Sequence, residues 1–204
     1  MPAIELFLAR RCPVCGGSLD LPGVCRACRE QIFPERAWGA VYLGRYSRLS
    51  GLVRAAKYRG HREAARWAGE LLARRVAGAG WDLAGVAFVP SFFWRAWARG
   101  YYLPAYLAEV VAGELGLELG RVLTRVRYTP SQTRSRRRRA LPQVFAARGA
   151  VEGDWLLVDD VYTTGATFRR AGEALVEAGA FRVYGAFLAV ADPRRLRGLP
   201  IRRL

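Results

Sequence analysis

The amino-acid sequence predicts an α/β domain in which a mostly parallel sheet is covered by helices. Continuous apolar runs at residues 155–158 and 183–190 are typical of strands that are buried on both faces. Segments with helical periodicity separate such runs along the chain, as in folds that alternate strands and helices. The chain has 204 residues, of which 52% are hydrophobic, so it can bury a sizeable core and is not disordered throughout.

The individual elements follow from apolar spacing and from the residues that favour turns. A strand is expected at residues 38–43, and residues 47–50 offer a helix start. Residues 52–76 have the spacing of an amphipathic helix that is interrupted near Gly60. The later elements are a strand at 86–89 ended by Pro90, a helix at 103–115, a strand around 121–126, a strand at 155–158, a helix at 166–178 ended by Gly179, and a strand at 183–190.

The charge is strongly positive, which calls for an anionic partner. Thirty-three basic residues against 17 acidic ones give a net charge of +16, and Lys57 is the only lysine. Nucleic acid, a phosphorylated substrate and a membrane surface would each suit this charge. The near-exclusive use of arginine and the absence of asparagine suggest a thermophile or a GC-rich genome.

The apolar runs are too short to cross a bilayer, which needs about 18–20 residues. Residues 1–11 lack the apolar core and the cleavage site of a secretory signal. We therefore expect no transmembrane helix and a cytoplasmic protein.

All the cysteines lie near the N-terminus in two Cys-x-x-Cys pairs, Cys12 with Cys15 and Cys25 with Cys28. Two such pairs can direct four thiolates at one tetrahedral Zn²⁺, which is then structural because no coordination position is left for chemistry. Two disulfides or a redox pair are the alternatives, and a cytoplasmic location disfavours the disulfides. We predict a zinc-binding module at residues 1–36 and a main domain at 37–204.

A second motif follows the apolar run at residues 155–158. Asp159 and Asp160 come directly after it, and a helical pattern then opens with Thr163, Thr164, Gly165, Ala166 and Thr167. Backbone N–H groups at a helix start, threonine hydroxyls and a flexible glycine together can hold one phosphate. The adjacent acids suit ribose hydroxyls or a hydrated Mg²⁺. The alternative is a strand-end turn with a threonine cap, which does not require the acid pair.

This segment resembles the phosphoribosyl-pyrophosphate motif of the type I phosphoribosyltransferases, in which apolar residues, two acids and a Thr-Thr-Gly-x-Thr loop follow one another. The resemblance implies the type I phosphoribosyltransferase fold. It places Asp159 and Asp160 on the ribose hydroxyls and residues 163–167 on the 5′-phosphate. It also implies displacement of pyrophosphate from ribose C1 by a nitrogen nucleophile, with the help of Mg²⁺.

A resemblance to the ComF family of competence-associated proteins covers nearly the whole chain. The matching segments, in order, are the four cysteines, Lys57-Tyr58-Arg59-Gly60, Val89-Pro90-Ser91, Arg99-Gly100-Tyr101, Gln132 and the phosphate motif. The resemblance implies contacts of Lys57, Arg99 and Gly100 with substrate or pyrophosphate. The chain departs from the family where Tyr102 and Leu103 replace an Asn-Gln pair, and where an asparagine is missing near Arg139.

The basic residues concentrate before the phosphate motif. Residues 121–148 hold nine arginines and no acid. This segment can close as a lid over pyrophosphate, follow a nucleic-acid backbone, or be a solvated loop. Together with this charge, the two resemblances imply two functions: a phosphoribosyltransferase, or a DNA-uptake accessory protein that binds single-stranded DNA and a competence helicase. The candidate lid or DNA contacts are Arg134, Arg136, Arg137, Arg138 and Arg139.

Overall fold

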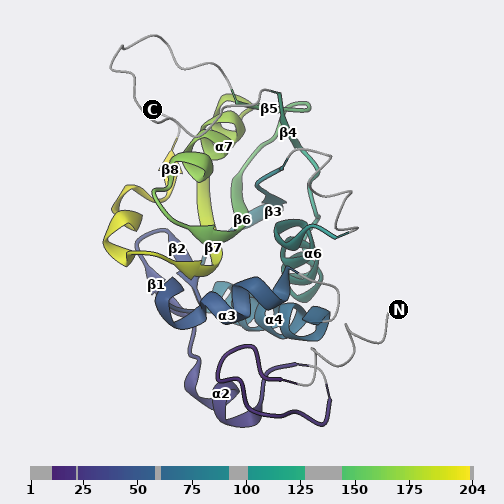
Figure 1. Ribbon diagram of the computed structural model, residues 1–204. Coiled ribbons are helices and arrows are strands. Elements are labelled where there is room, and N and C mark those ends of the chain that lie inside the picture. The colour runs from purple at the N-terminus through teal and green to yellow at the C-terminus, as the bar shows by residue number, and fades with distance from the viewer. Residues whose placement is uncertain (1–10, 22, 58–60, 92–100, 127–143, 203–204) are drawn as a thin grey trace.

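Figure 1 shows a computed structural model of the chain, which describes residues 11–21, 23–57, 61–91, 101–126 and 144–202. Its centre is a sheet with the strand order β1-β2-β7-β6-β3. Parallel pairs join β2 (Ala40–Tyr42) to β7 (Arg182–Val190), β7 to β6 (Asp154–Tyr162), and β6 to β3 (Leu83–Phe88). Two short strands pair antiparallel at the margins, β1 (Glu35–Ala37) with β2 and β8 (Ile201–Arg202) with β7. The predicted mostly parallel sheet is confirmed.

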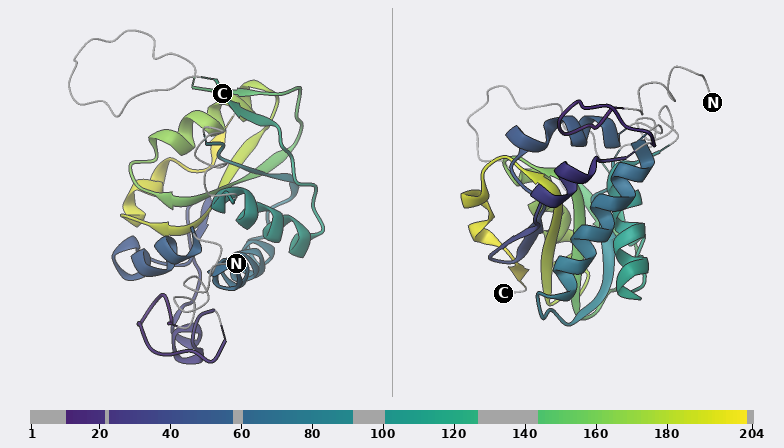
Figure 2. Two further views of the ribbon diagram at one scale, coloured as in Figure 1. Left: turned by 45° about the vertical axis from the view of Figure 1, so that its right-hand side comes forward. Right: turned by 90° about the horizontal axis from the view of Figure 1, so that it is seen from below.

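Helices cover both faces of this sheet (Figures 1 and 2). One face carries α3 (Tyr46–Ala56), α4 (Arg62–Ala77) and α6 (Leu103–Leu115), and the other carries α7 (Ala166–Glu177). Successive residues of β6 point to opposite faces, so Leu156 packs with the first group and Leu157 with α7. Both faces of β6 are therefore buried, which explains its uninterrupted apolar run.

The helix expected at residues 103–115 has these bounds, and the interruption near Gly60 separates α3 from α4. The main difference is the length of β6. The strand continues through both aspartates to Tyr162, because residues 159, 161 and 162 keep pairing with β7. A two-stranded antiparallel ribbon of β4 (Leu123–Arg125) and β5 (Phe145–Ala147) lies beside α7. Its second strand and the 3₁₀ helix η2 (Pro193–Gly198) were not expected.

The cysteine-bearing segment and α2 (Arg26–Gln31) lie beyond α3 and α4, at the bottom of Figure 1. Cys12, Val24, Cys28 and Ile32 belong to the same buried apolar cluster as α3 and α4. The guanidinium of Arg29 also lies 5.7 Å from the ring centre of Trp67 on α4. The segment thus packs directly against the helical layer.

Among the described residues, no helix combines the length and the apolar character that spanning a bilayer requires.

Candidate functional site

A cavity of about 230 Å³ lies at the carboxyl ends of β3 and β6. In parallel sheets this edge is where ligands bind, because loops and helix starts meet there. Its lining combines residues 89–91 after β3, the acid pair (Asp159 and Asp160), residues of the loop after β6, and Tyr102 and Arg125. With the start of α7 this loop forms the segment 163–167, of which Thr163, Gly165 and Thr167 line the cavity. The acid pair and the loop, which the sequence predicted as ligand contacts, therefore share one cavity.

The acid pair is held by its own backbone and by the only lysine of the chain. The backbone N–H of Asp160 donates to Oδ1 of Asp159 at 2.9 Å. Nζ of Lys57 lies 2.8 Å from Oδ2 of Asp160. Lys57 directly follows the last residue of α3, so the end of this helix delivers the ammonium to Asp160.

The two carboxyl groups differ in their environment. Burial, and after it the negative charge of Asp160, raises the pKa of Asp159 well above its ordinary value. The N–H of Asp160 and the charge of Lys57 act in the opposite direction, but they are weaker. Asp159 thus retains a proton to higher pH than an ordinary aspartic acid does.

The loop that follows β6 ends at the left-handed residue Gly165, which caps α7 with φ 79°. A side chain there would collide with the ring and hydroxyl of Tyr162, so only glycine fits. Within the loop, Oγ1 of Thr164 accepts from the N–H of Ala166 at 3.3 Å. Thr163, Gly165 and Thr167 line the cavity, whereas Thr164 and Ala166 are exposed beside it.

The loop is supported from behind by η2, a contact that sequence analysis missed. Nη1 of Arg195 donates to the carbonyl of Thr163 at 3.3 Å, and the Tyr162 hydroxyl donates to the carbonyl of Arg195 at 3.2 Å. The sequence did show a second basic cluster, with five arginines and one aspartate in residues 192–203. Nothing in its local pattern indicated that it would meet the threonine loop.

Another part of the cavity wall contains two further residues, Tyr102 and Arg125, whose role sequence analysis did not assign. The Tyr102 hydroxyl donates to the carbonyl of Val89 at 2.7 Å. Burial raises the pKa of Tyr102, and the charges of Asp159 and Asp160 add to this effect. The guanidinium carbon of Arg125 lies 5.5 Å from the ring centre of Phe145. The wall thus offers a neutral phenol and a cation near the acid pair.

Several predicted contact residues lie outside the described part of the chain. They are Arg99 and Gly100, and the candidate lid or DNA residues Arg134, Arg136, Arg137, Arg138 and Arg139.

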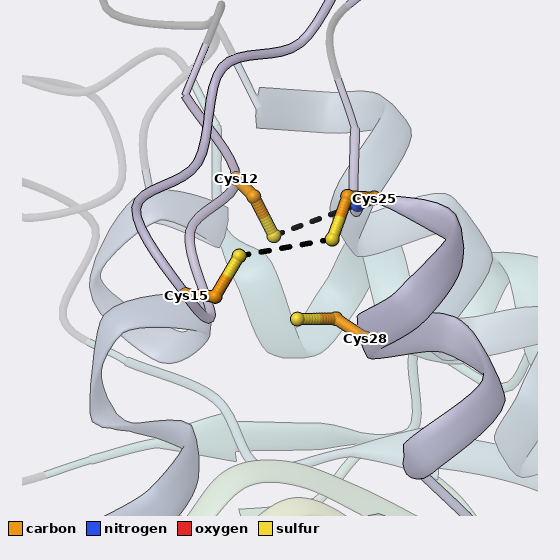
Figure 3. A group of neighbouring side chains, drawn as sticks. All are labelled: Cys12, Cys15, Cys25 and Cys28. Carbon is orange, nitrogen blue, oxygen red and sulfur yellow. Dashed lines mark hydrogen bonds between the residues drawn. The ribbon is translucent and has the colours of Figure 1, made fainter.

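The four cysteine sulfurs form a second candidate site, in which all side chains point toward one centre (Figure 3). The sulfurs lie within 4.8 Å of one another, and those of Cys15 and Cys25 are 3.7 Å apart. A tetrahedral ion with Zn–S bonds of about 2.3 Å requires sulfur separations of about 3.8 Å. The donor set and its spacing therefore fit Zn²⁺.

Backbone N–H groups favour the thiolate form at one of these positions. Burial opposes ionisation of Cys12, but hydrogen bonds from the backbone of Cys15, Cys25 and Val14 outweigh it and lower its pKa to about 6. The N–H of Cys25 lies 3.5 Å from the Cys12 sulfur. Burial and hydrogen bonds with the neighbouring cysteines raise the pKa of Cys28. A cation at the centre would supply the charge that four thiolates need.

No protein-family model and no curated protein matches the chain. Several solved structures are similar to it. Glutamine phosphoribosylpyrophosphate (PRPP) amidotransferase from B. subtilis, complexed with ADP and GMP, is 26% identical over 60% of this chain and 25% of its own, with a TM-score of 0.44. Orotate phosphoribosyltransferase from Aeropyrum pernix is 18% identical over 66% of each chain, with a TM-score of 0.37.

Adenine phosphoribosyltransferase from Leishmania tarentolae is 14% identical over 78% of this chain and 94% of its own, with a TM-score of 0.43. The chain spans only a quarter of the length of the amidotransferase it matches. At these TM-scores the likeness assigns no function by itself, and the residues of the cavity have to carry the functional argument.

Proposed function

We propose that the protein is a ComF-like phosphoribosyltransferase-fold protein that binds phosphoribosyl pyrophosphate, or a related ribose 5-phosphate compound, in the cavity at the end of β6. One observation carries this proposal. The acid pair and the glycine-capped loop line the same cavity, next to one another on one strand and the helix that follows it. A ligand that fits both has hydroxyl groups to donate and a phosphate to accept hydrogen bonds.

The two halves of the cavity have complementary chemistry. The carboxylates of Asp159 and Asp160 accept hydrogen bonds from the ribose 2′ and 3′ hydroxyls. The first N–H groups of α7 are without partners inside the helix and, with the hydroxyls of Thr163 and Thr167, donate to the 5′-phosphate. Gly165 supplies the left-handed backbone from which α7 begins, at a position where any side chain would collide with Tyr162.

The acid pair also fits Mg²⁺, because carboxylate oxygens are its preferred protein ligands. Asp159 and Asp160 would hold it, directly or through its water shell. When bound together with pyrophosphate, Mg²⁺ supplies positive charge to the phosphate oxygens. Lys57 already places one positive charge against Asp160, so the site balances part of its own negative charge.

We propose transfer of the phosphoribosyl group to an amine or a base as the activity. In this reaction a nitrogen nucleophile bonds to ribose C1, the bond from C1 to the pyrophosphate oxygen breaks, and pyrophosphate leaves with the electron pair. The nucleophile then releases one proton to solvent or to a basic group. Tyr102, Arg125 and Ser91 line the same cavity as the acid pair.

Calorimetric titration of the zinc-loaded protein with phosphoribosyl pyrophosphate and Mg²⁺ tests the binding proposal. We expect saturable binding that the double substitution Asp159→Asn and Asp160→Asn abolishes. Asp154→Asn is the matched control, because Asp154 begins the same strand at the opposite edge of the sheet. Equal binding by the double variant and the wild type would contradict the proposal. Pyrophosphate release with a panel of bases and amines then tests transfer.

We also propose that Cys12, Cys15, Cys25 and Cys28 hold a structural Zn²⁺. The spacing of the sulfurs supports this assignment. The cytoplasmic location that the sequence predicts is consistent with this assignment, because thiols stay reduced in that compartment and available to metal.

The second candidate is a DNA-uptake accessory function, in which the protein binds single-stranded DNA and a competence helicase. The net charge of +16, with nine arginines in residues 121–148, favours it. Titration of labelled single strands at several salt concentrations tests it. Affinity should fall steeply with salt, and replacement of Arg136, Arg137, Arg138 and Arg139 by alanine should flatten that dependence.

A further inference from the structure

The cysteine-bearing segment touches the middle of α3 through a backbone contact. Pro13, which lies between the ligands Cys12 and Cys15, places its carbonyl where a side chain at Gly51 would be. Glycine inside a helix costs about 1 kcal/mol relative to alanine. Gly51 is nevertheless in the interior of α3, because any larger residue would push the cysteine loop away from the helix.

Other contacts reinforce this docking. Cys12 and Cys28 share a buried cluster with Leu52, Val53 and Ala56 of α3. Nη2 of Arg48, also on α3, donates to the carbonyl of Gln31 at 3.2 Å. The segment therefore holds α3 through apolar packing, a close backbone approach and a polar contact.

The other end of α3 lies beside the ligand cavity, because Lys57 contacts Asp160, which lines the cavity. Lys57 follows Ala56 and continues the helix with a hydrogen bond from its N–H to the carbonyl of Arg54 at 3.2 Å. Six residues of helix span about 9 Å, so Gly51 and Lys57 belong to one short rigid element. That element connects the cysteine cluster to Asp160.

We propose that the four-cysteine module positions Lys57 by clamping α3, so that metal binding in the module controls the affinity of the acid-pair cavity for its phosphorylated ligand. This inference rests on the proposed function for its ligand. Loss of the metal, or oxidation of the thiols, releases the loop that contacts Gly51. The helix then moves, and Lys57 no longer holds Asp160.

The geometry makes the site sensitive to small displacements. Lys57 and Asp160 are 2.8 Å apart, and a shift of about 1 Å takes such a pair beyond hydrogen-bond length. Without the ammonium, both carboxylates face an anionic ligand with their negative charge uncompensated. Ligand affinity therefore depends on where α3 lies.

The test uses Gly51→Ala, which adds one methyl group against Pro13 and improves the intrinsic helix propensity of α3. Gly113→Ala is the matched control, since it is also inside a helix but has open space around it. We expect Gly51→Ala to bind phosphoribosyl pyrophosphate about tenfold more weakly and Gly113→Ala to bind it as the wild type does. Wild-type protein that has been stripped of zinc, freed of chelator and returned to Mg²⁺ should bind the ligand more weakly by a similar factor.

A double-mutant cycle shows whether the effect passes through Lys57. In a Lys57→Met background, Gly51→Ala should have no further effect on affinity. Independent effects of the two changes would overturn the proposal, as would unchanged affinity in zinc-loaded Gly51→Ala. If that variant does not fold, Arg48→Ala replaces it, with Arg54→Ala on the same helix as its charge-matched control.

Hydrogen exchange at the amides of Lys57 and Asp160 provides a readout that needs no ligand. We expect faster exchange at the Lys57 amide in Gly51→Ala and in metal-free protein, but not in Gly113→Ala. If the wild type fails to bind the ligand, the proposed function fails while this exchange still tests the clamp. Unchanged exchange in both perturbed forms would overturn the clamp, whatever the ligand.

Discussion

The ammonium of Lys57 lies 2.8 Å from Oδ2 of Asp160 and joins the end of α3 to the acid pair near the end of β6. The side chain of Asp160 is only 19% exposed, and that of Lys57 is 36% exposed. The pair is thus partly desolvated, which strengthens it beyond a typical surface ion pair. It places the only lysine of the chain against an aspartate that lines the candidate ligand cavity.

Replacement of Lys57 by methionine should weaken the binding of phosphoribosyl pyrophosphate by about tenfold, because an anionic ligand then meets an uncompensated acid pair. The dependence on Mg²⁺ should become steeper, because the metal has to supply the missing charge. Calorimetry at several Mg²⁺ concentrations measures both effects. Lys57→Arg keeps the charge and should recover part of the affinity. Equal affinity in wild type and Lys57→Met would exclude a role for this ammonium.

Replacement of Asp159 by asparagine should stabilise the fold at pH 8 while it abolishes ligand binding. The pKa of Asp159 is raised in the folded state, so its favourable contribution is complete below its unfolded pKa and is lost as pH rises through the folded pKa. Asparagine has the same shape, keeps an oxygen for the N–H of Asp160 and carries no charge. Its advantage should therefore grow with pH.

Thermal unfolding between pH 5 and pH 8 measures this effect, and each 1 kcal/mol corresponds to about 2–4 °C in a protein of this size. Asp154→Asn removes a carboxylate 3.8 Å from Arg182 and should give no such stabilisation. A wild type as stable as Asp159→Asn at pH 8 would mean that the charge of this desolvated carboxylate is not destabilising.

Replacement of Gly165 by alanine should destabilise the protein more than the same change at another glycine with a left-handed backbone. The new methyl group would strain the backbone and also collide with Tyr162. Gly116→Ala is the control, because Gly116 also has a positive φ of 65° but has no atom near a new methyl group. We expect a loss of about 1 kcal/mol for Gly116→Ala and at least twice that for Gly165→Ala. Only Gly165→Ala should lose phosphate binding, which calorimetry can show.

The cysteine cluster should bind one Zn²⁺ per chain, and its removal should lower the thermal stability. Because the chain has four cysteines and all of them belong to the cluster, thiol titration reports on this site alone. We expect the metal-loaded protein to react slowly with a thiol reagent and to release zinc as the thiols react. Four rapidly reacting thiols in the presence of zinc would contradict the assignment.

The long elements and the local motifs were predictable from the sequence. Periodicity indicated α6 and the break between α3 and α4, and the cysteine spacing indicated the cluster, because these signals lie within one segment. The strand over residues 155–158 was predicted too short, because two aspartates are unusual in a strand interior. Pairing of residues 159, 161 and 162 with β7 outweighs the low strand propensity of the two aspartates.

The contacts between segments that are distant in the chain could not be predicted from the sequence. The Arg195 support of Thr163 and the Lys57 contact with Asp160 depend on how η2 and α3 pack against the end of β6. The wall formed by Tyr102 and Arg125 likewise joins the start of α6 to β4. Such contacts leave no periodic signal in a single sequence, since each partner satisfies its own local pattern.

The strand order has a consequence for synthesis on the ribosome. β2 pairs with β7, although most of the domain lies between them in the chain. The hairpin of β1 and β2 therefore leaves the ribosomal tunnel long before the strand that covers its open edge. Strands that lie far apart in the sequence pair slowly, and an unpaired strand edge can form hydrogen bonds with other chains. The nascent protein thus carries an exposed edge until β7 emerges, and newly made chains are most prone to aggregate during that interval.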